Sequence, residues 1–88
     1  MRARVNEEFI DLAIDELKNH VKSCLKRHGD GTFASKHEAY GILAEEVQEL
    51  LSAIEKNYDS DRLELEFKDV AQVCVFALAC LKAKTMDW

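Results

Sequence analysis

The sequence contains no proline and only three glycines, so it has few of the residues that interrupt helices. It also lacks the alternation of apolar and polar residues that marks strands. Both absences predict an all-α fold. A chain of 88 residues without linkers, repeats or low-complexity stretches is expected to form a single helical domain, residues 1–88.

Several classes of protein are disfavoured by what is missing. No apolar stretch is long enough to cross a membrane, and the N-terminus lacks the apolar core of a signal peptide. There is no basic run, and the net charge is −5, which argues against nucleic-acid and anionic membrane partners. The sequence has an odd number of cysteines and no CxxC spacing, as is typical of reduced thiols; they are Cys24, Cys74 and Cys80. We therefore expect a cytoplasmic protein.

Apolar residues recur at helical spacing in three segments, which predicts a three-helix protomer. The first segment begins after Asn6, a residue suited to capping, and ends near His28, before a glycine-rich stop. The second runs from about 35 to 57 and opens on a capping-box pattern. The third runs from about 61 to 84. Only residues 58–60 separate the last two segments, so they are expected to form an antiparallel helical hairpin.

The third segment changes character along its length. Residues 70–81 are apolar on almost every side, and a helix of this kind is buried on every side. Two neighbouring helices cannot cover it in so small a monomer. The pattern therefore predicts self-association into an oligomeric helix bundle, in which a partner subunit covers Val75, Phe76 and Ala79.

Carboxylates form two pairs on the predicted hairpin. Glu46 and Glu49 are three positions apart, as are Glu66 and Asp69, so each pair lies on one helix face. Glu49 and Asp69 each lie ten positions from Asp59, which places both pairs about 15 Å from the turn. Glu66 falls within the apolar stripe, where charges are rare unless paired or bound to a metal. Four carboxylates that meet repel one another unless a cation joins them, and oxygen ligands suit Mg²⁺, with Mn²⁺ as an alternative.

These residues resemble a known family. Glu45-Glu46-Val47-Gln48-Glu49, followed after sixteen residues by Glu66-Phe67-Lys68-Asp69, is similar to the signature of the all-α nucleoside triphosphate pyrophosphohydrolases of the MazG type. Their relatives are the all-α dUTPases, the dCTP pyrophosphatases and the phosphoribosyl-ATP pyrophosphohydrolases. The resemblance covers about residues 35–80. It implies a homo-oligomer, either a dimer or a tetramer, in which Glu46, Glu49, Glu66 and Asp69 are metal ligands and catalytic residues.

The combined prediction is a Mg²⁺-dependent hydrolase that converts a nucleoside triphosphate to the monophosphate and pyrophosphate. Arg62 shares a flank with Glu66 and Asp69, so it is either a phosphate contact or the partner of an i, i+4 ion pair with Glu66. Lys56 is a second candidate for substrate binding. Because few residues follow Asp69, base recognition is expected from the first helix, from residues 29–35 or from a neighbouring subunit.

Two alternatives stay open at this point. The acids could be solvated on the surface of a non-catalytic helical oligomerisation module, which would show no dependence on metal. The chain could also keep the metal site and bind nucleotides without hydrolysing them. His20 lies at the edge of the apolar stripe of the first helix, where a histidine is more often structural than functional.

Overall fold

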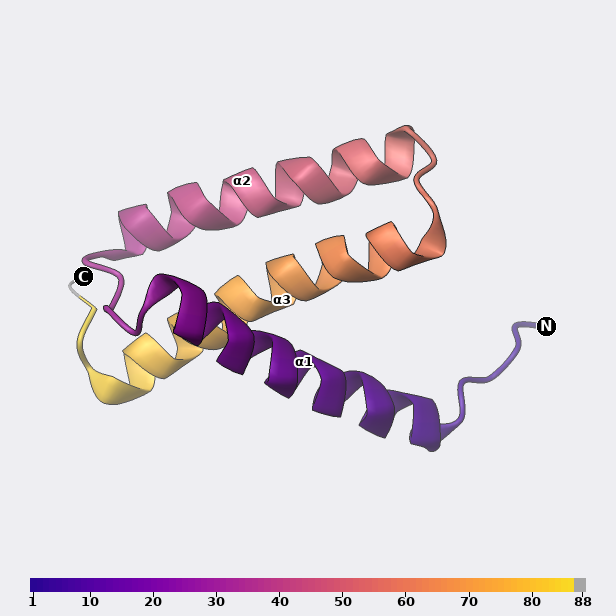
Figure 1. The fold of residues 1–88 in the computed structure, drawn as a ribbon, viewed down its shortest axis with the longest axis horizontal. Coiled ribbons are helices and arrows are strands. Elements are labelled where there is room, and N and C mark those ends of the chain that lie inside the picture. Colours follow the sequence, from indigo (N-terminus) through magenta and orange to yellow (C-terminus); the bar gives the residue numbers. More distant parts are fainter. Residues whose placement is uncertain (87–88) are drawn as a thin grey trace.

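A computed structural model describes residues 1–86, which form three α-helices and no strand (Figure 1). The helices are α1 (Glu7–His28), α2 (Lys36–Glu55) and α3 (Ser60–Ala83). Their bounds lie within two residues of those expected from the apolar periodicity. The prediction of an all-α fold is therefore confirmed.

Side chains cap the N-terminus of every helix, and two of these caps, Asn6 and Ser35, are those that the sequence predicts. Ser35 accepts a hydrogen bond from the backbone N–H of Glu38 at 3.3 Å. The Glu38 side chain in turn accepts a hydrogen bond from the backbone N–H of Ala34 at 3.2 Å. In the usual capping box this second bond comes from the N–H of the cap residue, here Ser35, so it is displaced by one residue. Asn6 and Asp59 accept equivalent bonds from the first turns of α1 and α3.

α3 is the central element of the fold. It packs against both α1 and α2, whereas α1 and α2 do not pack against each other. Figure 1 shows α2 and α3 lying side by side, with the short connection at one end, while α1 crosses α3. The N-terminal part of α1 extends away from the other two helices in this view. Functional groups that meet between helices must therefore meet around α3.

A buried apolar cluster lies where the α1–α2 connection meets the C-terminal part of α3. Its buried members are Phe33, Val73, Cys80 and Met86. The ring of Phe33 packs edge-to-face against Phe76, with centroids 5.1 Å apart and planes at 88°. Phe33 thereby anchors the connection to α3.

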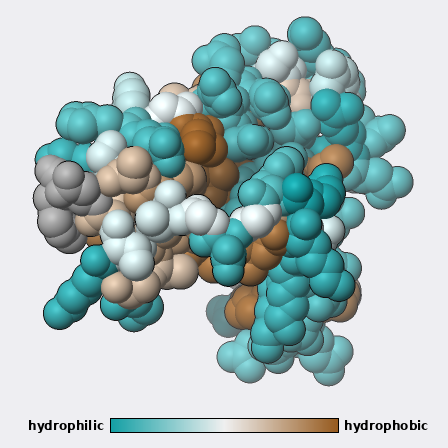
Figure 2. Space-filling model, turned by 60° about the vertical axis from the view of Figure 1, so that its left-hand side comes forward, coloured by the Kyte–Doolittle hydropathy of each residue, from teal (hydrophilic) through white to brown (hydrophobic). Residues whose placement is uncertain are grey.

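The protein exposes much apolar surface. Its accessible area is 7217 Å², whereas a folded monomer of this mass exposes about 5,300 Å². Within α3, Leu78 is 57% exposed and Val75 is 37% exposed. In Figure 2, brown apolar side chains reach the surface between the teal ones. Further exposed apolar side chains lie on the other helices, among them Phe9, Ile14, Tyr40, Leu51 and Ile54.

In the described part of the chain, no helix has the length and apolarity to cross a membrane.

Candidate metal centre

Three of the four predicted acids meet between α2 and α3. Glu46 comes from α2, and Glu66 and Asp69 come from consecutive turns of α3. One carboxylate oxygen from each of the three lies within 4.8 Å of the others. This acidic triad has the spacing that a single cation could bridge.

Glu66 is the most deeply placed acid, with 3% of the residue exposed. Its Oε1 accepts a hydrogen bond from Arg62 Nε at 2.9 Å. Its Oε2 is buried and has no hydrogen-bond partner, and the same holds for Oε2 of Glu46. Buried carboxylate oxygens without partners are destabilising, and a divalent cation bound by oxygen ligands would satisfy both. The residues therefore fit Mg²⁺ or Mn²⁺ by their chemistry and by these two unpaired oxygens.

The electrostatic environment of Glu46 matches this interpretation. Burial raises the pKa of Glu46 above the ordinary value, and the nearby negative charges of Glu49, Asp69 and Glu66 raise it further. The pKa of Arg62 is also raised, first by its hydrogen bond to Glu66 and then by the charge of Glu66. Negative charge is thus concentrated at the triad and only partly balanced by Arg62.

A third helix reaches the triad through His20. Its Nε2 lies 2.8 Å from Oδ1 of Asp69, and only 12% of its side chain is exposed. Cys24, one turn further along α1, places its sulfur 3.7 Å from the same nitrogen. Sequence reasoning favoured a structural role for this histidine. The contact with Asp69 depends on how α1 crosses α3, and the only sequence signal was the position of His20 at the edge of the apolar stripe.

The remaining predicted site residues lie outside the triad. Glu49 is exposed, yet close enough for its charge to raise the pKa of Glu46. Arg62 forms the i, i+4 ion pair with Glu66 and also stands 5.3 Å from the ring centroid of Tyr58. Lys56 is the exposed C-cap residue of α2 at the connection to α3. Its assignment as a substrate contact stays a prediction.

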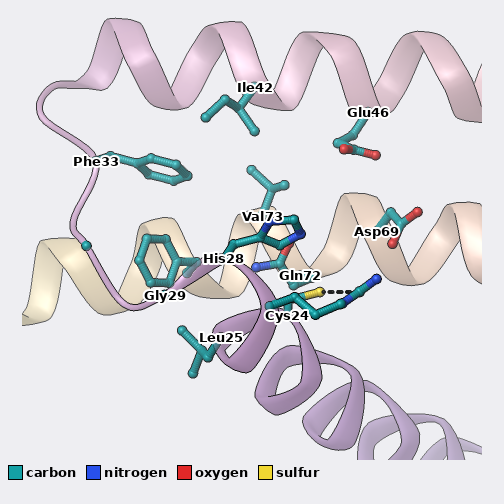
Figure 3. Close-up of a pocket in the computed structure, with 13 residues that line it drawn as sticks. Cys24, Leu25, His28, Gly29, Phe33, Ile42, Glu46, Asp69, Gln72 and Val73 are labelled. Atoms are coloured by element: carbon teal, nitrogen blue, oxygen red, sulfur yellow. Dashed lines mark hydrogen bonds between the residues drawn. The ribbon is translucent and has the colours of Figure 1, made fainter.

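A cavity of about 500 Å³ adjoins the triad. Glu46 and Asp69 belong to its wall, and Figure 3 shows them on facing sides of the space between α2 and α3. Phe33 and Val73 lie further along the same space (Figure 3). Another part of the cavity wall is formed by the end of α1 and by the connection that follows it, where Gly29 adopts a φ of 82°. The other lining residues include Cys24, Leu25, Arg27, His28, Ile42, Gln72 and Phe76.

Comparisons with protein-family models, with curated proteins and with solved structures found no match for this chain. The geometry of the triad and of the cavity is therefore the basis for a functional assignment.

Proposed function

We propose that the protein is a Mg²⁺-dependent nucleoside triphosphate pyrophosphohydrolase, which releases a monophosphate and pyrophosphate. The observation that carries this proposal is the pair of buried, unpartnered oxygens, Oε2 of Glu46 and Oε2 of Glu66, within the acidic triad. Hard oxygen ligands of this kind suit Mg²⁺, with Mn²⁺ as an alternative. The activity is the one implied by the resemblance to MazG-type enzymes.

The acids have distinct positions in this scheme. When bound, the metal would neutralise phosphate charge and lower the pKa of the attacking water. Glu46, Glu66 and Asp69 would hold it from the two helices of an antiparallel hairpin formed by α2 and α3. Glu49 is exposed and its charge acts on Glu46, so it would be available to the same metal or to a second one. Arg62, with its side chain 55% exposed, keeps its terminal nitrogens available for a substrate phosphate.

The cavity offers a place for the nucleoside. Its volume is within the range of small-molecule sites, about 300 to 1,000 Å³. Phe33 and Ile42 provide apolar surface for a base, and the amide of Gln72 provides one acceptor and two donors for a base edge. Glu46 and Asp69 at the cavity wall place the metal next to the substrate. Of these base contacts, Phe33 belongs to residues 29–35, one of the three places from which the sequence predicts base recognition.

A homo-oligomer, dimer or tetramer, is part of this proposal. The chain exposes about 1,900 Å² more than a monomer of its mass normally does. A typical stable interface buries about 800 Å² on each partner. Val75 and Leu78 on α3 are exposed apolar residues that a second copy would cover.

A non-catalytic helical oligomerisation or nucleotide-binding module is the second candidate. The ion pair between Arg62 and Glu66 favours it, because this contact already balances part of the negative charge of the triad. In that case the exposed Glu49 would be a solvated surface acid.

The test is pyrophosphate release from a panel of ribonucleoside and deoxyribonucleoside triphosphates, with Mg²⁺ and with chelator. We expect metal-dependent release with the nucleoside monophosphate as co-product, and ³¹P NMR distinguishes these two products from a nucleoside diphosphate and orthophosphate. Binding of a nucleotide without turnover would favour the second candidate. Metal-independent release would contradict the proposed role of the triad.

A further inference from the structure

We propose that His20 is a positioning residue for the metal centre, which holds the Asp69 carboxylate in the orientation that a divalent cation requires. The inference rests on the proposed function. Its basis is the 2.8 Å contact between His20 Nε2 and Asp69 Oδ1, formed by residues 49 positions apart in the sequence.

The direction of this hydrogen bond follows from the chemistry of the two groups. An ionised carboxylate only accepts, so Nε2 of His20 carries a hydrogen and donates the hydrogen bond to Oδ1 of Asp69. This holds for the neutral Nε2–H tautomer and for the imidazolium alike. Cys24 lies against the same nitrogen, and its sulfur accepts a hydrogen bond from Arg27 at 3.5 Å. The hydrogen bond to Asp69 therefore orients the imidazole, and Cys24 packs beside Nε2.

The two acids of α3 are held in the same way. Arg62 binds Oε1 of Glu66, and His20 binds Oδ1 of Asp69. Each bond restricts the rotation of one carboxylate and leaves its second oxygen available to a cation. Partners of this kind around metal ligands change metal affinity by about 10- to 100-fold.

Burial makes the His20 bond an effective restraint. The His20 side chain is 12% exposed and that of Asp69 is 29% exposed, so water has limited access to compete for the bond. α1 packs against α3 and not against α2. His20 is therefore the residue through which α1 could influence the ligand geometry of the triad.

α1 and α3 share a second polar link, which provides a matched control. Lys68 Nζ lies 3.6 Å from Glu16 Oε2, and Glu16 is one turn before His20 on α1. Glu16→Gln removes this ion pair between α1 and α3, and Glu16 is not part of the triad. A general loosening of α1 and a loss of Asp69 orientation can thus be separated.

The experiment is a calorimetric titration of Mn²⁺ into four proteins, each first shown to be folded by circular dichroism. The proteins are the wild type, His20→Leu, His20→Gln and Glu16→Gln. We expect His20→Leu to raise the Mn²⁺ dissociation constant about 10- to 100-fold. His20→Gln should recover most of the affinity, because its amide N–H can occupy the place of Nε2–H. Glu16→Gln should bind as the wild type does.

A measurement on the wild type alone guards against a His20→Leu variant that does not fold. In ¹⁵N-labelled protein, the Nε2–H of His20 should give a resonance that shifts when diamagnetic Mg²⁺ is added. A resonance that does not respond to saturating Mg²⁺ would overturn the inference.

The outcomes separate the two proposals. Failure of the wild type to bind either ion would count against the proposed function itself. Binding by the wild type with unchanged affinity in His20→Leu would overturn only the positioning role. Equal weakening in His20→Leu and Glu16→Gln would also overturn it, since a general docking role of α1 would then account for the loss.

Discussion

Arg62 Nε donates a 2.9 Å hydrogen bond to Glu66 Oε1, but Oε2 of the same carboxylate is buried without a partner. The ion pair therefore satisfies only one of the two carboxylate oxygens of a glutamate that is 3% exposed. The Arg62 side chain is 55% exposed and that of Glu66 is 4% exposed, so solvent screens the arginine end of the pair while the carboxylate stays buried. A cation on the Oε2 side would account for the rest.

The raised pKa of Glu46 predicts a pH dependence in the metal-free protein. Burial is the main cause, and neighbouring acids add to it, so the folded-state pKa lies above the ordinary 4.5. A carboxyl group whose pKa is higher in the folded state stabilises the folded state at pH values below its unfolded-state pKa. This stabilisation is lost as pH rises through the folded-state pKa. We expect the free energy of unfolding of the wild type, relative to Glu46→Gln, to fall as pH rises above 4.5. Urea unfolding in chelator at stepped pH measures this difference, and a difference that does not vary with pH would contradict it.

Gln72→Leu is expected to impair substrate binding without affecting the metal. The amide of Gln72 lines the cavity but is not part of the triad. Loss of one or two hydrogen bonds to a base corresponds to about a tenfold rise in KM, with little change in kcat. Steady-state kinetics on the preferred triphosphate provide the check. An unchanged KM would place the base elsewhere, whereas weaker Mn²⁺ binding would show that the substitution disturbs the triad.

A charge on the exposed face of α3 should prevent the proposed oligomer from forming. Leu78 is 57% exposed in the single chain, and burial of a glutamate at that position against a second copy would be strongly unfavourable. We expect Leu78→Glu to sediment as a monomer at concentrations where the wild type does not. A wild-type protein that sediments as a monomer would refute the assembly, and an oligomeric Leu78→Glu would move the interface to another face.

The fold was accessible from the sequence because its determinants are local. The caps at Asn6 and Ser35 and the periodic apolar residues act within one or two turns, so they are legible in the sequence. The start of α3 followed from the apolar periodicity, and its cap at Asp59 is seen in the structure. To predict that Glu46 meets Glu66, one further inference is needed. The short connection makes the two helices neighbours, and the two acid pairs lie at similar distances from it.

The rest of the site depends on contacts between distant residues. The approach of His20 to Asp69 is set by the crossing of α1 over α3, which apolar periodicity does not specify. The cavity likewise depends on the turn at Gly29 and on how Phe33 packs against Phe76. Position along the helix axis placed Glu49 level with Asp69, but only the packed structure shows that Glu49 is exposed.

The most direct measurement of the central claim compares Glu66→Gln with Glu64→Gln, which changes an exposed acid two residues away on the same helix. Mg²⁺ that binds only the folded state stabilises it by about 2.7 kcal/mol at 100 times its dissociation constant. We predict that Mg²⁺ stabilises the wild type and Glu64→Gln in this way, which is measured as a rise in Tm. Both proteins should also show Mg²⁺-dependent pyrophosphate release. Glu66→Gln should fold, but lose both responses. Full turnover and an unchanged Mg²⁺ response in Glu66→Gln would contradict the assignment of the acidic triad as the metal centre.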